Sequence, residues 1–157
     1  MKYLLIAFIV FVALAPLSHF VPSKRQRLIA RLREYAALKG LFVEFRQPPG
    51  RSASAAGTAR AVRDIYYGKR LPYGRASAAA RRGGWVVEEG AWRAVNWRDP
   101  VPGPLSRLPS QAYAATVDEG SCGVYWDETG GEVEVDTICA VLEDWARELR
   151  PAEGDFA

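Results

Sequence analysis

The most conspicuous pattern along the chain is an apolar run near its N-terminus. Residues 3–21 read YLLIAFIVFVALAPLSHFV, nineteen positions without a formal charge when His19 is neutral. A helix of that length is about 28 Å long, which matches the hydrocarbon core of a bilayer. The pattern predicts a transmembrane anchor over residues 1–22. A cleaved secretory signal ending at Ala15 is the alternative, although Pro16 disfavours cleavage directly before it.

A basic amphipathic segment follows the apolar run. Ser23 and Gln26 have the spacing of a capping box and Gly40 suits a C-cap, so we expect a basic juxtamembrane helix over residues 23–40. Basic flanks stay on the cytoplasmic side of a membrane, which predicts a cytoplasmic C-terminal domain. The residues expected to contact anionic lipid are Lys24, Arg25, Arg27, Arg31 and Arg33.

Alternation of apolar and polar positions predicts a sheet in the remaining chain. Residues 41–46 read LFVEFR and alternate strictly, and the aromatic residues around 65–67 favour a second strand. Residues 85–88 and 91–97 flank Glu-Gly and predict a hairpin. Two further strands are expected, at 121–126 and, after a glycine-containing turn, at 132–135.

Helical spacing and loop residues complete the predicted domain. Asp136 is expected to cap a last helix that presents Ile138, Leu142, Trp145 and Leu149 on one face. A short helix is expected from Ser110 to about Val117, and residues 51–58, 76–84 and 99–109 are expected to lack regular structure. The predicted fold class is therefore α+β: an N-terminal transmembrane helix, the basic helix, then a cytoplasmic domain over 41–157 with a mainly antiparallel sheet covered by a C-terminal helix.

Charge is distributed unevenly along the chain. The net charge is only +3, yet residues 108–157 carry two basic and twelve acidic side chains, against nineteen and six in the part before them. Screening limits electrostatic effects to near neighbours, so oppositely charged parts of one small fold are expected to face each other. A basic isoelectric point is therefore poor evidence for nucleic-acid binding.

Candidate catalytic chemistry is sparse. His19 is the only histidine and lies in the apolar run, which excludes serine or cysteine triads and histidine-containing zinc sites in the rest of the chain. Cys122 and Cys139 are expected to be reduced thiols that fill core space, one on a strand and one on the covering helix. Neither dinucleotide nor phosphate-loop motifs occur. The sequence therefore predicts no catalytic residue, no metal and no cofactor.

One stretch has the composition of a recognition surface, because basic residues alternate there with tyrosines. Such a surface suits an acidic protein segment or inner-leaflet lipid, and in principle RNA or single-stranded DNA, although a membrane tether disfavours nucleic acid. Pairing with the acidic end of the same chain is the structural alternative. The residues of this candidate interaction patch are Arg60, Arg63, Tyr66, Tyr67, Lys69, Arg70, Tyr73 and Arg75.

The layout of the first third resembles a known family. An apolar span, Pro22, the basic residues Lys24, Arg25 and Arg27 around Gln26, and a strand up to residue 46 are similar to the single-span YajC-type accessory subunit of the bacterial preprotein translocase. The whole chain is also similar to single-span proteins of bacteria with arginine-rich proteomes, since it contains seventeen arginines and four lysines. The resemblance implies an inner-membrane protein that works beside a larger membrane assembly.

These expectations combine into one functional hypothesis. The sequence favours a non-enzymatic, membrane-anchored cytoplasmic interaction module, an accessory component whose partners are the lipid bilayer and another membrane protein. Two alternatives remain open. One is an enzyme that acts on an anionic substrate at the membrane face. The other is a periplasmic domain with a disulfide between Cys122 and Cys139.

Overall fold

The computed structural model describes residues 23–50, 64–71 and 82–149, together with residues 3, 4, 6, 8, 9 and 11. The chain divides into two compact units, Met1–Arg31 and Leu32–Ala157, and every strand described belongs to the second. The elements, in chain order, are α2 (Lys24–Leu38), β1 (Phe42–Arg46), β2 (Asp64–Arg70), β3 (Gly83–Glu88), β4 (Ala91–Ala94), the 3₁₀ helix η4 (Gly103–Arg107), β5 (Ala112–Val117), β6 (Ser121–Trp126) and α4 (Glu132–Glu148).

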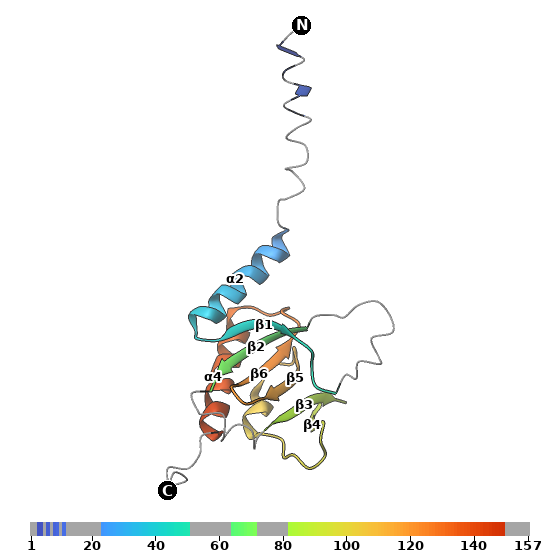
Figure 1. Ribbon diagram of the computed structural model, residues 1–157, viewed down its shortest axis with the longest axis vertical. Coiled ribbons are helices and arrows are strands. Elements are labelled where there is room, and N and C mark those ends of the chain that lie inside the picture. Colours follow the sequence, from blue (N-terminus) through green and yellow to red (C-terminus); the bar gives the residue numbers. More distant parts are fainter. Residues whose placement is uncertain are drawn as a thin grey trace. The chain divides into compact units, whose positions relative to one another are not determined.

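The six strands form one antiparallel sheet in the order β1-β2-β6-β5-β3-β4, and α4 packs across one of its faces (Figure 1). The predicted α+β class with a mainly antiparallel sheet and a covering C-terminal helix is confirmed in this part. β2 and β5 pair with the two edges of β6, side chains pack on both of its faces, and all six of its residues are buried.

The predicted membrane-spanning helix is the part of the fold class that requires correction. Within the described portion of the chain, no helix has both the length and the apolar character that a membrane crossing requires. Helices α2 and α4 have 15 and 17 residues and carry charged side chains, whereas a span needs about 20 mainly apolar residues. Most of residues 3–21 lies outside the described residues. The single-pass and inner-membrane assignments, and the cytoplasmic location derived from them, are therefore withdrawn.

Both ends of α2 follow the sequence prediction. The Ser23 N–H donates to Oε1 of Gln26 at 2.8 Å, and the Gln26 N–H donates to Oγ of Ser23 at 3.2 Å, so the capping box forms. At the other end Gly40 adopts a φ of +80°, and the Leu41 N–H donates to the Ala36 carbonyl at 3.0 Å. This is the Schellman arrangement, which glycine adopts without the strain of a Cβ atom.

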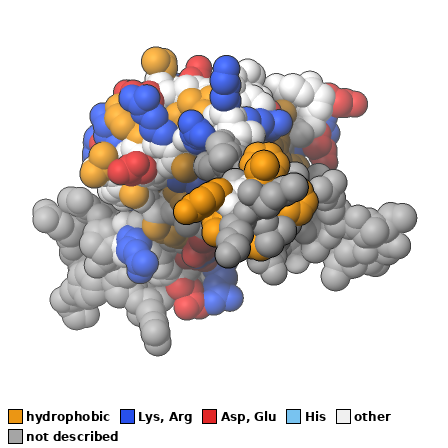
Figure 2. Space-filling model, turned by 90° about the horizontal axis from the view of Figure 1, so that it is seen from above, with side chains coloured by type: hydrophobic (Ala, Val, Ile, Leu, Met, Phe, Trp, Pro, Cys, Tyr) orange, Lys and Arg blue, Asp and Glu red, His pale blue; other side chains and the backbone are white. Residues whose placement is uncertain are grey.

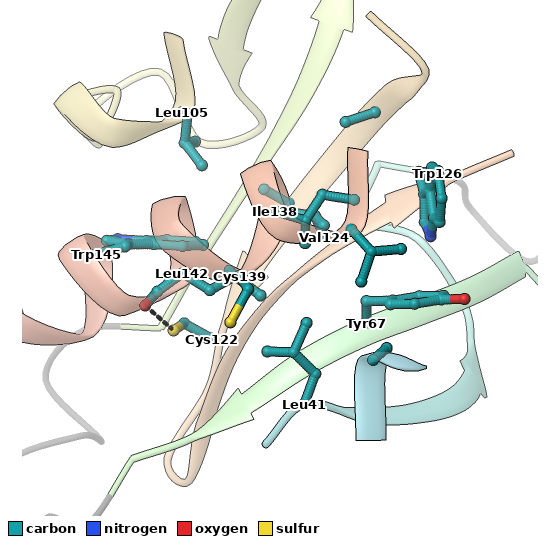
Figure 3. Close-up of a cluster of buried hydrophobic side chains, with 14 of the residues drawn as sticks. Leu41, Tyr67, Leu105, Cys122, Val124, Trp126, Ile138, Cys139, Leu142 and Trp145 are labelled. Atoms are coloured by element: carbon teal, nitrogen blue, oxygen red, sulfur yellow. Dashed lines mark hydrogen bonds between the residues drawn. The ribbon is translucent and has the colours of Figure 1, made fainter. Parts of the chain in front are cut away.

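The main core lies between α4 and the sheet. Figure 3 shows Ile138 and Leu142 of α4 near Val124 and Cys122 of β6, with Trp145 in the same cluster. Edge-to-face ring pairs add to this packing: Trp85 with Trp145 at 5.4 Å and Tyr67 with Trp126 at 5.3 Å between ring centroids. Such pairs contribute about 0.5–1.5 kcal/mol beyond the burial of their area.

A short segment after β1 crosses the opposite face of the sheet. The Tyr125 hydroxyl donates to the Gln47 carbonyl at 3.0 Å, and Pro49 lies directly over Gly84 of β3, where a Cβ atom would approach Pro49 Cβ to 2.6 Å. Glycine at position 84 is therefore required by close packing rather than by backbone conformation. Residues 47–50 thus connect the β1 edge with the β3 end of the sheet, as Figure 1 shows.

Three predicted elements differ in the structure. Residues 112–117, expected in a short helix, form β5, because pairing with β3 and β6 satisfies their backbone and its small alanines fit into the clusters on both faces of the sheet. Residues 132–135, expected in a strand, form the first turn of α4, where Glu132 and Glu134 face the positive end of the helix dipole. Asp136 therefore lies inside the helix rather than at its cap. The proline-rich stretch 99–109 contains η4, with proline in its first turn.

Candidate functional site

The basic residues of α2 have two different environments. Lys24, Arg25, Arg27 and Arg31 are exposed. Arg33 instead points into the fold, where its Nε and Nη2 atoms donate to the two carboxylate oxygens of Glu128 at 2.8 and 2.7 Å. Four of the five residues predicted to contact lipid are thus exposed, whereas the fifth, Arg33, forms an ion pair within the fold.

The candidate interaction patch is not one surface in the described residues. Arg60, Arg63, Tyr73 and Arg75 lie outside them. Neighbouring strand residues point to opposite faces of a sheet, so Tyr66 and Tyr67 are separated by the sheet and both are fully buried. The remaining two members are engaged within the fold: Lys69 pairs with Glu143 at 2.8 Å, and the Arg70 guanidinium lies 5.4 Å from the ring centre of Phe42.

Ion pairs join the basic part of the chain to its acidic end, as the charge distribution predicts. Each pair below has its base before residue 108 and its acid after it. Figure 2 accordingly shows basic and acidic side chains next to one another on the face viewed. The charge asymmetry of the sequence is in large part neutralised within the fold by the pairs Arg33–Glu128, Lys39–Asp136, Arg46–Asp118, Lys69–Glu143, Arg82–Glu119 and Arg107–Asp144.

Glu128 is the centre of the most buried of these pairs. In addition to the two bonds from Arg33, it accepts a hydrogen bond from the Tyr67 hydroxyl at 2.9 Å. Its φ of +56° lies in the left-handed region, which is uncommon for a residue with a Cβ atom. Burial, with the Glu128 charge and hydrogen bond adding to it, raises the pKa of Tyr67, which keeps this hydroxyl a donor. Two elements, α2 and β2, are thereby fastened to one carboxylate.

The two cysteines are free and buried, as predicted, so the bridge of the periplasmic alternative is not formed. Burial raises the pKa of Cys122 to about 12, and burial also raises the pKa of Cys139. Since the thiolate is the reactive form, neither thiol is placed for nucleophilic chemistry at neutral pH.

The described carboxylates with shifted pKa values all shift in the direction of stronger acids. Hydrogen bonds from basic side chains or backbone N–H groups lower the pKa of each, and even burial, the largest single influence on Asp118, is outweighed by its hydrogen bonds. A general acid needs the opposite shift. The residues are Asp118, Glu134, Asp136, Glu143 and Asp144.

An exposed apolar surface lies beside the edge strand β4. Trp97 is 82% exposed, and Val95 and Val101, at 48% and 44%, lie in the same stretch of chain. The Arg98 guanidinium covers one side of the indole, 4.9 Å from its ring centre. We call Ala91–Ala94 together with Val95, Trp97 and Val101 the β4 surface. The sequence analysis places Trp97 at the end of the strand predicted over 91–97, whereas β4 ends at Ala94. The proline-rich segment that begins shortly after Trp97 was the signal in the sequence that the strand ends earlier.

The β4 surface combines a hollow with a strand edge that no other strand of the described residues pairs with. β4 is last in the strand order, and the Val95 N–H donates inward to the Gly84 carbonyl at 2.9 Å. Backbone groups alternate in direction along an antiparallel strand, so those of Trp92 and Ala94 point away from β3. A hollow of about 490 Å³ lies alongside, lined by Trp92, Val101 and Leu108 among others.

No family model matches the chain, and neither a curated protein nor a solved structure matches it. The resemblance to the translocase accessory subunit therefore stays a prediction from the sequence.

Proposed function

We propose that this chain is a non-enzymatic interaction module that binds an extended segment of a partner protein along the free edge of β4. The observation that carries the proposal is the exposed indole of Trp97 beside that edge. Tryptophan is enriched among the few residues that dominate binding energy, and burial of a large apolar side chain contributes about 1.5–3 kcal/mol. An exposed tryptophan next to an unpaired strand is a suitable anchor for a partner.

The backbone of β4 supports binding by strand addition. The N–H and C=O groups of Trp92 and Ala94 face away from β3, in the direction from which a further strand would approach. An extended peptide can bond to them without any change in the β4 backbone. Each such bond contributes only about 0.5–1.5 kcal/mol net, so a strand of four residues needs side-chain contacts as well.

Side chains on the two faces of β4 predict an alternating partner. Trp92 borders the hollow on the α4 face. Arg93 lies on the opposite face, because it pairs in register with Val86. Residues of an added strand alternate between the same two faces. The partner segment should therefore place apolar side chains toward the hollow and polar or acidic side chains toward Arg93.

Site-specific photocrosslinking in cells tests the proposal on the full chain. Benzoylphenylalanine replaces Trp97 in one variant and Val133 in a matched control, since Val133 is also apolar and 73% exposed but lies in the first turn of α4. We expect a discrete adduct from position 97, whose crosslinked partner peptide, read by mass spectrometry, is an extended segment of alternating polarity. No adduct at position 97, or the same adducts from both positions, would contradict the proposal.

A further inference from the structure

A second concavity, separate from the β4 surface, has the form of a small-molecule site. It encloses about 330 Å³ and lies between the start of β3, the end of β5, the last turn of α4 and residues 99–102. Pockets for small ligands measure about 300–1,000 Å³ and have mostly apolar walls with a few polar groups. The concavity is at the lower limit of this range. We call it the tryptophan cleft.

The apolar walls of the tryptophan cleft are held in place by the core. Trp85 and Trp145 both line it and pack edge to face against each other, and each is at least 95% buried. The indole N–H of Trp85 donates to the Pro100 carbonyl at 3.0 Å, which fastens the connector that forms the third wall. The walls therefore exist before any ligand binds, so binding does not require them to become ordered.

The start of β3 leaves bare backbone at the cleft. Gly83 lines it, and a Cβ atom there would approach the Trp85 ring to 2.5 Å. Glycine thus permits the tryptophan ring and the strand backbone to lie in direct contact. A glycine inside a strand often marks a place where another group approaches the backbone closely.

The charged groups at the cleft favour a positively charged ligand. The carboxylate of Asp99 lines the cleft, together with two charged groups that have partners of their own, Glu148 and Arg82. Arg82 is already paired with Glu119, outside the cleft lining. The Asp99 carboxylate accepts a long hydrogen bond of 3.4 Å from Asn96, which leaves it able to accept a stronger one. Aromatic rings also attract cations, by about 0.5–2 kcal/mol.

We infer that the tryptophan cleft binds a small organic cation, an apolar body about the size of one ring that carries an ammonium group. The body packs against the walls of the cleft at Trp85, Trp145 and Val117, and the ammonium group donates to Asp99. The lining of the cleft includes neither β4 nor Trp97, so this inference does not rest on partner binding at the β4 surface.

Three ligands of matched size test the inference by NMR titration of the ¹⁵N-labelled full chain. 2-Phenylethylammonium is the cation, 2-phenylethanol the neutral analogue and 3-phenylpropanoate the anion. We expect the cation to shift the indole N–H signals of Trp85 and Trp145 with saturation, to bind about fivefold more tightly than the alcohol, and to bind far more tightly than the anion. Equal affinities, tighter binding of the anion, or no saturable shift of either indole would overturn the inference.

Two variants distinguish the effect of the Asp99 carboxylate on cation binding from general effects of a substitution on folding. Asp99→Asn should weaken the cation about fivefold and leave the alcohol unchanged, since only the charge is lost. Glu89→Gln is the control, because Glu89 is 86% exposed in the turn at the far end of β3 and is not a lining residue. Equal effects of the two substitutions on cation binding would refute the role of Asp99, and the spectra themselves show whether each variant is folded.

Discussion

Removal of the Glu128 carboxylate should reveal how much the Arg33 ion pair contributes to the stability of the fold. Glu128→Ala deletes the acceptor of three hydrogen bonds, two from Arg33 and one from Tyr67. It leaves the Tyr67 hydroxyl buried without this partner, at a cost of about 1–3 kcal/mol. Loss of one member of a buried ion pair costs about 3–5 kcal/mol.

The partial exposure of Arg33 lowers the cost expected for the loss of this ion pair. The Arg33 side chain is 34% exposed and that of Glu128 only 6%, so the guanidinium can reach water once its partner is gone. We therefore expect Glu128→Ala to lower the free energy of unfolding by about 3 kcal/mol, the low end of the range. Glu128→Gly should cost about 1 kcal/mol less than the alanine variant, because glycine adopts the φ of +56° without strain.

Urea unfolding of the full chain, followed by tryptophan fluorescence, measures these differences. A double-mutant cycle with Arg33→Met isolates the pair, and we expect a coupling energy of about 2 kcal/mol. Tyr67→Phe provides the matched control for the third hydrogen bond. A Glu128→Ala variant within 0.5 kcal/mol of the parent protein, or a coupling energy near zero, would show that the pair does not fasten α2 to the sheet.

Three further predictions concern packing, thiols and pH. Gly84→Ala should destabilise the fold by about 1–3 kcal/mol, because its Cβ atom would overlap Pro49; an unfolding free energy equal to that of the parent would refute this. Cys122 should resist a thiol reagent at pH 8 in the native state, since burial raises its pKa to about 12, and should react at once in denaturant; rapid native labelling traced to Cys122 by mass spectrometry contradicts the burial. Asp118 is a stronger acid in the fold than when unfolded, so its contribution is complete above the unfolded pKa and is lost as the pH falls through the lower folded pKa. The stability advantage of the parent over Asp118→Asn should therefore decrease from about pH 5 to about pH 3, and an advantage independent of pH would refute the assignment.

The internal ion pairs change how the composition is interpreted. Two basic residues that the sequence assigned to a lipid-binding or recognition surface, Arg33 and Lys69, have acidic partners within the fold. An ion pair within the fold compensates an exposed charge, but nothing compensates an exposed large apolar side chain except burial against another surface. Trp97 therefore indicates binding more strongly than the arginines do.

The sequence by itself determined those elements whose signals are local. The capping box at Ser23 and the αL turn at Gly40 depend on contacts within a few residues of chain, and both form as expected. The strict alternation of residues 41–46 and the Glu-Gly turn of the hairpin also sufficed to predict β1 and the β3–β4 pair.

Only the tertiary structure decided the elements and pairings that depend on distant partners. Residues 112–117 have the composition of a helix and become a strand because β3 and β6 hydrogen-bond to both of their edges. Glu128 acquires its role from Arg33, 95 positions away, and the full burial of both Tyr66 and Tyr67 depends on side chains from other elements. Backbone pairing and the desolvation of charges are properties of groups brought together in space, so a pattern along the chain can predict an element without determining what it will contact.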